Sequence, residues 1–95
     1  MAIDLNRARV SIQPHVRVSL GSDGAVLLDL ECGAYLSLNR TGGRIWSRLT
    51  DGAAPQAIAS ELAASCGIDE RRVQADVQNF LGNLQERGLV RIDHQ

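Results

Sequence analysis

Few side chains in this sequence have the chemistry of catalysis or metal binding. The residues that most often act as nucleophile, general base or soft metal ligand are two histidines and two cysteines, His15, His94, Cys32 and Cys66. Catalysis by a nucleophile and a base needs groups that converge with matched pKa values, and a structural zinc site needs a closed set of ligands. These residues are too few and too scattered, so we expect no catalytic residue, no metal site and no cofactor.

Motifs for phosphate binding are missing as well. Thr41-Gly42-Gly43 does not belong to a GxxxxGK pattern, and all 10 basic residues are arginine, so the chain has no phosphate-loop lysine. Several acidic residues, among them Asp51, Asp69 and Asp76, stand three or four positions from an arginine, as on ordinary solvated helix faces. The sequence therefore predicts a binding protein rather than an enzyme.

Length and composition predict one small domain. A chain of 95 residues has no room for a second core, and a net charge of −1 argues against a dedicated polyanion binder. The cysteines form no CxxC motif and the N-terminus has no apolar signal region, which favours the cytoplasm. No apolar run approaches the length of a membrane span. We expect a single domain, residues 1–95, with an ordered core from about 10 to 92.

Adjacent strands form the centre of the predicted fold. The even-numbered positions of residues 26–30 are apolar, the period of a strand with those positions on its buried face. Residues 31–33 include a glycine that suits a tight turn, and residues 34–38 alternate again as a return strand. A first strand over residues 15–20 completes a three-stranded antiparallel meander.

Three helices follow the strands. Asn39 is a favoured N-cap for a helix over residues 40–49. Gly42-Gly43 in its first turn lowers helix propensity and indicates that another backbone, that of the sheet, passes close by. Pro55 begins the second helix, and a regular apolar stripe predicts a longer third helix over residues 70–87. Three strands followed by three helices give an α+β fold.

The two ends of the chain are expected to carry little structure. Residues 1–9 are polar and mixed, which is typical of a loose arm. Residues 10–12 form a further strand candidate, which Pro14 separates from the first strand. Residues 89–92 follow a helix stop and are expected to form only a short extended tail.

Two binding hypotheses fit these elements. The second and third helices resemble a helix-turn-helix, in which Arg71 and Arg72 would reach bases or phosphates of DNA. Asp69, Glu70 and Asp76 surround these arginines and cancel the positive field on which DNA affinity depends. The chain also ends before a wing hairpin is formed. A small winged-helix DNA-binding regulator is therefore the less favoured alternative.

The favoured hypothesis begins at the edge of the sheet. A meander leaves a strand edge unpaired, and an unpaired edge accepts another strand. The third strand would lie near the third helix, so that the two form a groove with backbone groups on one wall and apolar side chains on the other. Such a groove captures an extended peptide by β-augmentation. The alternative is that the N-terminal arm or the first strand covers this edge, and that Tyr35 and Phe80 are ordinary packing residues.

One stretch of the chain resembles a known family. Val26-Leu-Leu-Asp-Leu-Glu-Cys-Gly-Ala-Tyr-Leu-Ser-Leu-Asn39, followed by Thr41-Gly42 and Ile45-Trp46, is similar to the signature LLD…G.Y..LN.TG..IW of PqqD-like proteins. The resemblance covers about residues 15–92. It implies a winged-helix-like domain, a three-stranded antiparallel sheet followed by three helices, that has no catalytic activity and recognises the leaders of ribosomally made, modified peptides (RiPPs).

The chain looks most like the small leader-binding proteins of lasso-peptide pathways. The resemblance implies that the domain binds a precursor leader peptide as an added strand and delivers it to a separate leader peptidase and cyclase. It implies neither a nucleic acid nor a membrane as partner. We expect a monomer, with a dimer through the free edge as the alternative. The implied peptide-binding residues lie on the third strand and third helix: Ala34, Tyr35, Leu36, Ser37, Leu38, Val73, Asp76, Val77 and Phe80.

Two positions depart from the family pattern. Proline usually follows the asparagine that ends the strand, and here that position is Arg40. The second helix lacks the usual capping residue and has Ala54 instead. Neither position lies in the implied groove, so both departures concern helix stability more than binding. Other modified-peptide pathways, including quinone-cofactor maturation, remain open beside the lasso pathway.

Overall fold

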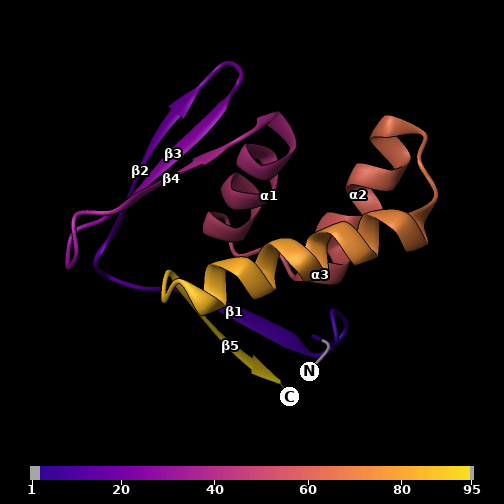
Figure 1. Ribbon diagram of the computed structural model, residues 1–95. Coiled ribbons are helices and arrows are strands. Elements are labelled where there is room, and N and C mark those ends of the chain that lie inside the picture. The colour runs from indigo at the N-terminus through magenta and orange to yellow at the C-terminus, as the bar shows by residue number, and fades with distance from the viewer. Residues whose placement is uncertain (1–2, 95) are drawn as a thin grey trace.

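The computed structural model describes residues 3–94, which form two small antiparallel sheets and three helices (Figure 1). The predicted α+β fold is confirmed, and one further strand is added at each end of the chain. In Figure 1 the larger sheet lies beside α1 (Arg40–Thr50), α3 (Glu70–Glu86) runs through the middle, and β1 (Ala8–Ile12) and β5 (Val90–His94) lie side by side below α3. The elements are β1 (Ala8–Ile12), β2 (Val16–Gly21), β3 (Gly24–Asp29), β4 (Tyr35–Leu38), α1 (Arg40–Thr50), α2 (Pro55–Cys66), α3 (Glu70–Glu86) and β5 (Val90–His94).

The three-stranded antiparallel sheet has the expected order β2-β3-β4, but its predicted buried face is wrong. Leu27 is buried against the helices, whereas Val26 and Leu28 are 40% and 38% exposed on the other face. Apolar side chains occupy both faces of β3, so the period alone does not identify the buried one. Packing against α1 identifies it, because a Cβ on Gly43 would lie only 3.3 Å from the carbonyl carbon of Gly24. The predicted close approach of the sheet to this glycine is confirmed.

The two ends of the chain form a sheet of their own, which corrects the predicted loose arm and extended tail. β1 pairs with β5 in antiparallel register, with Ile12 opposite Val90. Before β1, Ile3 is buried in the core, and its carbonyl oxygen accepts a 2.7 Å hydrogen bond from Nε2 of Gln78. The paired strands are far apart in the sequence, so no local pattern indicates the pairing. Residues 1 and 2 of the predicted arm lie outside the described residues.

The helices begin where their cap residues place them. The side-chain oxygen of Asn39 accepts a 2.8 Å hydrogen bond from the backbone N–H of Gly42, and Asp69 accepts a 2.9 Å bond from that of Arg71. α2 begins at Pro55 without a side-chain cap. Because Asn39 alone separates β4 from α1, the strand and the first turn of the helix are held side by side.

The core joins both sheets to the helices. Trp46 of α1 is 1% exposed and packs with Leu27 of β3, Leu84 of α3 and Val90 of β5. Its indole N–H has no hydrogen-bond partner among the described residues. Because Trp46 is the only tryptophan in the sequence, its fluorescence reports on the packing of both sheets.

Candidate functional site

A hollow of about 420 Å³ lies between β4, the first turn of α1 and α3. β4 supplies Leu36, Ser37 and Leu38 to its lining, and α3 supplies Asp76 and Phe80. The structure therefore brings these five predicted residues together along one hollow. We call it the β4–α3 groove.

The edge of β4 that points away from β3 is unpaired among residues 3–94. The backbone N–H of Asp29 donates a 2.9 Å hydrogen bond to the carbonyl oxygen of Ala34, and the hydrogen-bonding groups of a strand alternate between its two edges. The two leucines of β4 therefore bond to β3, while the N–H and C=O groups of Tyr35 and Ser37 point to the open edge. Neither the described part of the N-terminal arm, from residue 3 on, nor the first strand pairs with this edge, because β1 pairs with β5 and β2 lies across the sheet.

One face of α3 forms a wall of the groove, and another face of the same helix packs into the core. Asp76, Phe80 and Asn83 line the groove and are spaced three and four residues apart, as on one helix face. Val73 and Val77, which are also among the predicted residues, are buried in the core instead. The apolar stripe in the sequence locates α3, but it does not show where the core face ends and the groove face begins.

Phe80 forms the apolar part of that wall. Its ring is partly buried and packs against both parts of the core. A Cβ on Gly42 would lie 3.4 Å from Cε1 of Phe80 and 3.4 Å from Cβ of Leu38. The missing side chain of Gly42 thus leaves the ring room beside α1 and keeps the groove open.

The first turn of α1 supplies groove residues that the sequence reasoning did not include. Asn39, Thr41, Gly42 and Ile45 all line the hollow. The sequence feature that could have indicated these residues is the N-cap of α1, Asn39. Because Asn39 follows β4 directly, the first turn of the helix has to lie beside the end of the open edge.

Two further predicted residues, Ala34 and Tyr35, do not line the hollow with their side chains. Tyr35 is 71% exposed and lies on the outer face of the sheet, opposite Leu28. Ala34 is exposed and precedes β4 in the turn. Both contribute through the backbone, because Ala34 holds the pairing with β3 and Tyr35 presents its N–H and C=O groups to the open edge.

Asp29 fixes the turn that aligns β4. Its Oδ1 atom accepts hydrogen bonds from the backbone N–H groups of Glu31, at 2.9 Å, and Cys32, at 3.4 Å. The bond from Glu31, the bonds from Cys32 and the nearby His15 hold the pKa of Asp29 below its ordinary value of 3.8, although desolvation opposes them. The carboxylate is therefore ionised at neutral pH and holds the turn in place.

The groove offers backbone hydrogen-bonding groups, apolar side chains and one carboxylate, that of Asp76. Within residues 3–94, no three histidine, cysteine, aspartate or glutamate side chains gather closely enough to hold a metal ion. No helix in the described part of the chain is long and apolar enough to cross a membrane. A lining of this kind suits an extended peptide that adds a strand to β4 and places apolar side chains against α3.

Comparisons with known proteins agree with this geometry. The family described as coenzyme PQQ synthesis protein D (PqqD) matches residues 24–90. The chain belongs to the PqqD family. The matched segment runs from the start of β3 to the start of β5 and contains both walls of the groove. None of the curated proteins compared with the chain matches it.

Two solved structures share the fold of this PqqD-family protein. One is TbiB1 in complex with the TbiA(beta) leader peptide, with 34% sequence identity, a TM-score of 0.80, and coverage of 84% of this chain and 93% of that chain. The other is a lasso peptide synthetase B1 complexed with the leader peptide, with 29% identity, a TM-score of 0.81, and coverage of 87% and 98%. In both structures the relative is bound to a leader peptide.

Proposed function

We propose that this protein is a leader-peptide-binding adaptor of lasso-peptide (RiPP) biosynthesis, which captures a precursor peptide by strand addition to β4. One observation carries the proposal. The open edge of β4 directs the backbone groups of Tyr35 and Ser37 outward beside a groove whose other wall includes Phe80. The PqqD family match and the two leader-bound structures support a leader peptide as the occupant.

Leader binding of this kind needs both walls of the groove. Micromolar affinity requires about −8 kcal/mol net, and ordering an extended leader costs roughly 2–5 kcal/mol. Hydrogen bonds to the outward backbone groups of Tyr35 and Ser37 contribute about 1 kcal/mol each, which is not enough alone. At least two or three apolar leader side chains must therefore be buried against Leu36, Leu38 or Phe80, each contributing roughly 1.5–3 kcal/mol.

The adaptor itself carries out no chemistry in this proposal. It presents the bound leader to a separate leader peptidase and a cyclase, which cut the precursor and close its ring. It acts in the cytoplasm as a monomer whose β4 edge receives the leader rather than a second copy. The lasso pathway is favoured over quinone-cofactor maturation because one of the similar structures is a lasso peptide synthetase.

The sharpest test changes the open edge and leaves the walls intact. Ser37→Pro removes an N–H that points away from β3, and proline is tolerated on an edge strand. The added leader loses that hydrogen bond and meets the proline ring, so we expect binding of a synthetic leader from the neighbouring precursor gene to weaken by about tenfold or more. Isothermal titration calorimetry measures the affinity, and two-dimensional amide NMR locates the shifts.

Val18→Pro is the matched control, on the other edge of the same sheet. The backbone N–H of Leu30 donates to the carbonyl oxygen of His15, so by alternation the N–H of Val18 points outward from β2. We expect this variant to bind the leader as the unmodified protein does. Strand addition at β4 is wrong if the leader binds Ser37→Pro normally, or if both variants lose the same affinity.

A short DNA duplex is the parallel sample in the NMR titration. Leader-induced shifts on β4 and on the groove face of α3, with no response to DNA, support the adaptor function. Shifts confined to the region of Arg71 and Arg72 with DNA, and none with the leader, would favour the small regulator instead.

A further inference from the structure

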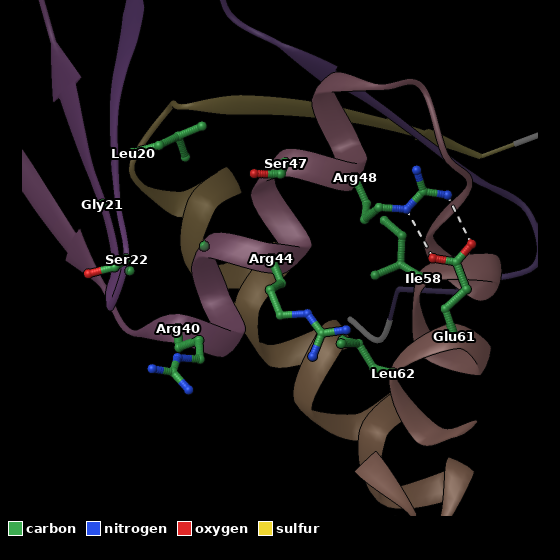
Figure 2. A pocket seen from close by; sticks show the side chains of 12 residues that line it. Leu20, Gly21, Ser22, Arg40, Arg44, Ser47, Arg48, Ile58, Glu61 and Leu62 are labelled. Atoms are coloured by element: carbon green, nitrogen blue, oxygen red, sulfur yellow. Dashed lines mark hydrogen bonds and ion pairs between the residues drawn. The ribbon is translucent and has the colours of Figure 1, made fainter. Parts of the chain in front are cut away.

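A second groove lies on another face of α1, away from the β4–α3 groove. Its hollow of about 310 Å³ is bounded by the β2–β3 turn, α1 and α2 (Figure 2). α1 contributes a row of three arginines to its lining, Arg40, Arg44 and Arg48. We call it the arginine groove. No residue lines both grooves, so an occupant of one leaves the lining of the other free.

The arginine groove also has an apolar wall. Leu20 is 63% exposed, although it pairs with the buried Ala25 and lies on the helix-facing side of the sheet. The end of the β2–β3 hairpin extends beyond the helices that cover the rest of this face of the sheet, so the side chain of Leu20 is exposed to solvent. Ile58 and Leu62 of α2 complete the apolar lining on the far side (Figure 2).

The three arginines differ in how well they are already paired. Arg48 donates two 2.9 Å hydrogen bonds to the carboxylate of Glu61, and Arg40 contacts Asp23 at 3.1 Å through side chains that are both highly exposed. Arg44 lies between them and donates only a 3.3 Å hydrogen bond to Oγ of Ser65. Among the described residues no carboxylate pairs with Arg44. The middle of the row is therefore a cation without an anion.

The spacing of the row fits an extended chain. A helix rises about 1.5 Å per residue, so Arg40 and Arg44 lie roughly 6 Å apart along the axis of α1. Alternate side chains of an extended peptide lie about 6.6 Å apart on one side of the chain. The intervening side chains of such a peptide point to its opposite side, and Leu20 is the exposed apolar side chain of the lining that they can meet.

We propose that the arginine groove docks an extended acidic segment of a partner protein, in which carboxylates alternate with apolar side chains. Arginine and carboxylate pair through two parallel hydrogen bonds, and Arg44 is the anchor because its charge is unmatched. Nucleic acid does not suit this surface, because contacts to successive phosphates need several unpaired cations, and Asp23, Asp51 and Glu61 already pair with Arg40 and Arg48.

The identity of the partner rests on the proposed function, whereas the affinity of the groove for an acidic segment does not. An adaptor must hold its leader and the enzyme that processes it at the same time. Two grooves with separate linings on different faces of α1 permit this. The acidic segment therefore belongs to the enzyme that receives the leader.

The test uses the full chain and three synthetic peptides of five residues, acetylated and amidated: Glu-Leu-Glu-Leu-Glu, Gln-Leu-Gln-Leu-Gln and Lys-Leu-Lys-Leu-Lys. In two-dimensional amide NMR titrations, the acidic peptide is expected to shift the signals of Leu20, Gly21, Arg44 and Ser47, and the other two are not. Arg44→Glu is expected to weaken binding of the acidic peptide at least tenfold, and Arg44→Gln by a smaller factor. Arg72→Glu, an exposed arginine on α3 outside both grooves, is the matched control and keeps the affinity.

Each outcome decides the proposal. Equal shifts with the acidic and the glutamine peptide, or equal affinities of the Arg44→Glu and Arg72→Glu variants, overturn it. The leader peptide is titrated into the same variants, and unchanged leader affinity in Arg44→Glu supports two separate sites. A parallel loss of leader affinity in that variant overturns the second site. If the unmodified protein binds no leader, the proposed function fails while the peptide series still decides the arginine groove.

Discussion

The two grooves beside α1 are built on one helix and have different chemistry. The β4–α3 groove combines an unpaired strand edge with an aromatic ring and one carboxylate. The arginine groove combines three cations and one carboxylate with an exposed leucine. Thr41 and Ile45 of α1 line the β4–α3 groove, whereas the row of Arg40, Arg44 and Arg48 lines the arginine groove.

This difference separates two kinds of recognition within one small domain. An open strand edge binds the backbone of any extended chain, so the walls of the β4–α3 groove have to supply the selectivity. The arginine groove offers charge, so its selectivity comes from the carboxylates of its partner and depends on salt. Variants that change one groove are therefore expected to leave the other unaffected.

The largest expected effect follows from placing a charge in the β4–α3 groove. Phe80→Asp removes an apolar surface that contributes roughly 1.5–3 kcal/mol to binding when a leader side chain is buried against it. It also places a second carboxylate in the groove, which repels that of Asp76. We expect leader affinity to fall by roughly ten- to a hundredfold, while the acidic peptide binds the arginine groove as before. Isothermal titration calorimetry with both ligands measures the two affinities on one sample.

Because Phe80 is partly buried, loss of binding must be distinguished from loss of folding. The emission of the buried Trp46 and urea unfolding report on the fold. Phe80→Leu keeps an apolar side chain and is expected to retain most of the leader affinity. Unchanged leader binding in a folded Phe80→Asp protein would remove this residue from the site.

A smaller effect tests the room that Gly42 leaves in the groove. Gly42→Ala gains helix propensity of up to about 1 kcal/mol, yet its new Cβ lies 3.4 Å from Leu38 and from the ring of Phe80. We expect the free energy of unfolding to change by less than about 1 kcal/mol and the leader affinity to fall about threefold. Gly82→Ala is the control, because no atom beyond its chain neighbours and the adjoining backbone of α3 lies within 4 Å of its Cβ position. It should stabilise the protein and leave leader binding unchanged, and equal leader affinities in the two variants would contradict the role of Gly42.

The features that could be predicted from the sequence are local ones. The strand, turn and return strand from β3 to β4, and the cap at Asn39, are each determined by residues close together in the chain. Leu36, Ser37 and Leu38 were placed in the groove for the same reason, since a strand edge needs only the strand and its order in the sheet. The first strand of the sheet was likewise predicted to within one residue at each end.

The features that could not be predicted depend on distant contacts. The pairing of β1 with β5 joins the two ends of the chain, and neither segment alone indicates a partner. The buried face of β3 depends on the contact between Gly43 and Gly24, because apolar residues occupy both faces of the strand. The resemblance to PqqD-like proteins also implies Val73 and Val77 as groove residues. Their stripe marks the apolar face of α3, and only the packed structure shows that this face is covered by the core.

The smallest expected effect concerns the ion pair at the border of the arginine groove. Hydrogen bonds from Arg48, and then its positive charge, lower the pKa of Glu61 below its ordinary value of 4.5, although desolvation opposes them. A folded-state pKa below the unfolded value stabilises the protein above about pH 4.5, and this contribution is lost as the pH falls through the folded-state pKa. Glu61→Gln should therefore flatten the acid limb of the stability curve, as measured by urea unfolding with Trp46 fluorescence between about pH 6 and pH 3.

The same variant sharpens the comparison between the grooves. Without the carboxylate of Glu61, Arg48 keeps only its 3.4 Å contact with Asp51, so the acidic peptide should bind more tightly by a small factor while leader affinity stays the same. Glu86→Gln on α3, which removes an exposed carboxylate away from both grooves, should change neither affinity. Tighter leader binding in Glu61→Gln would mean that the two grooves are coupled through α1. Unchanged affinity for the acidic peptide would mean that the peptide is bound through Arg44 alone and that Arg48 does not contribute.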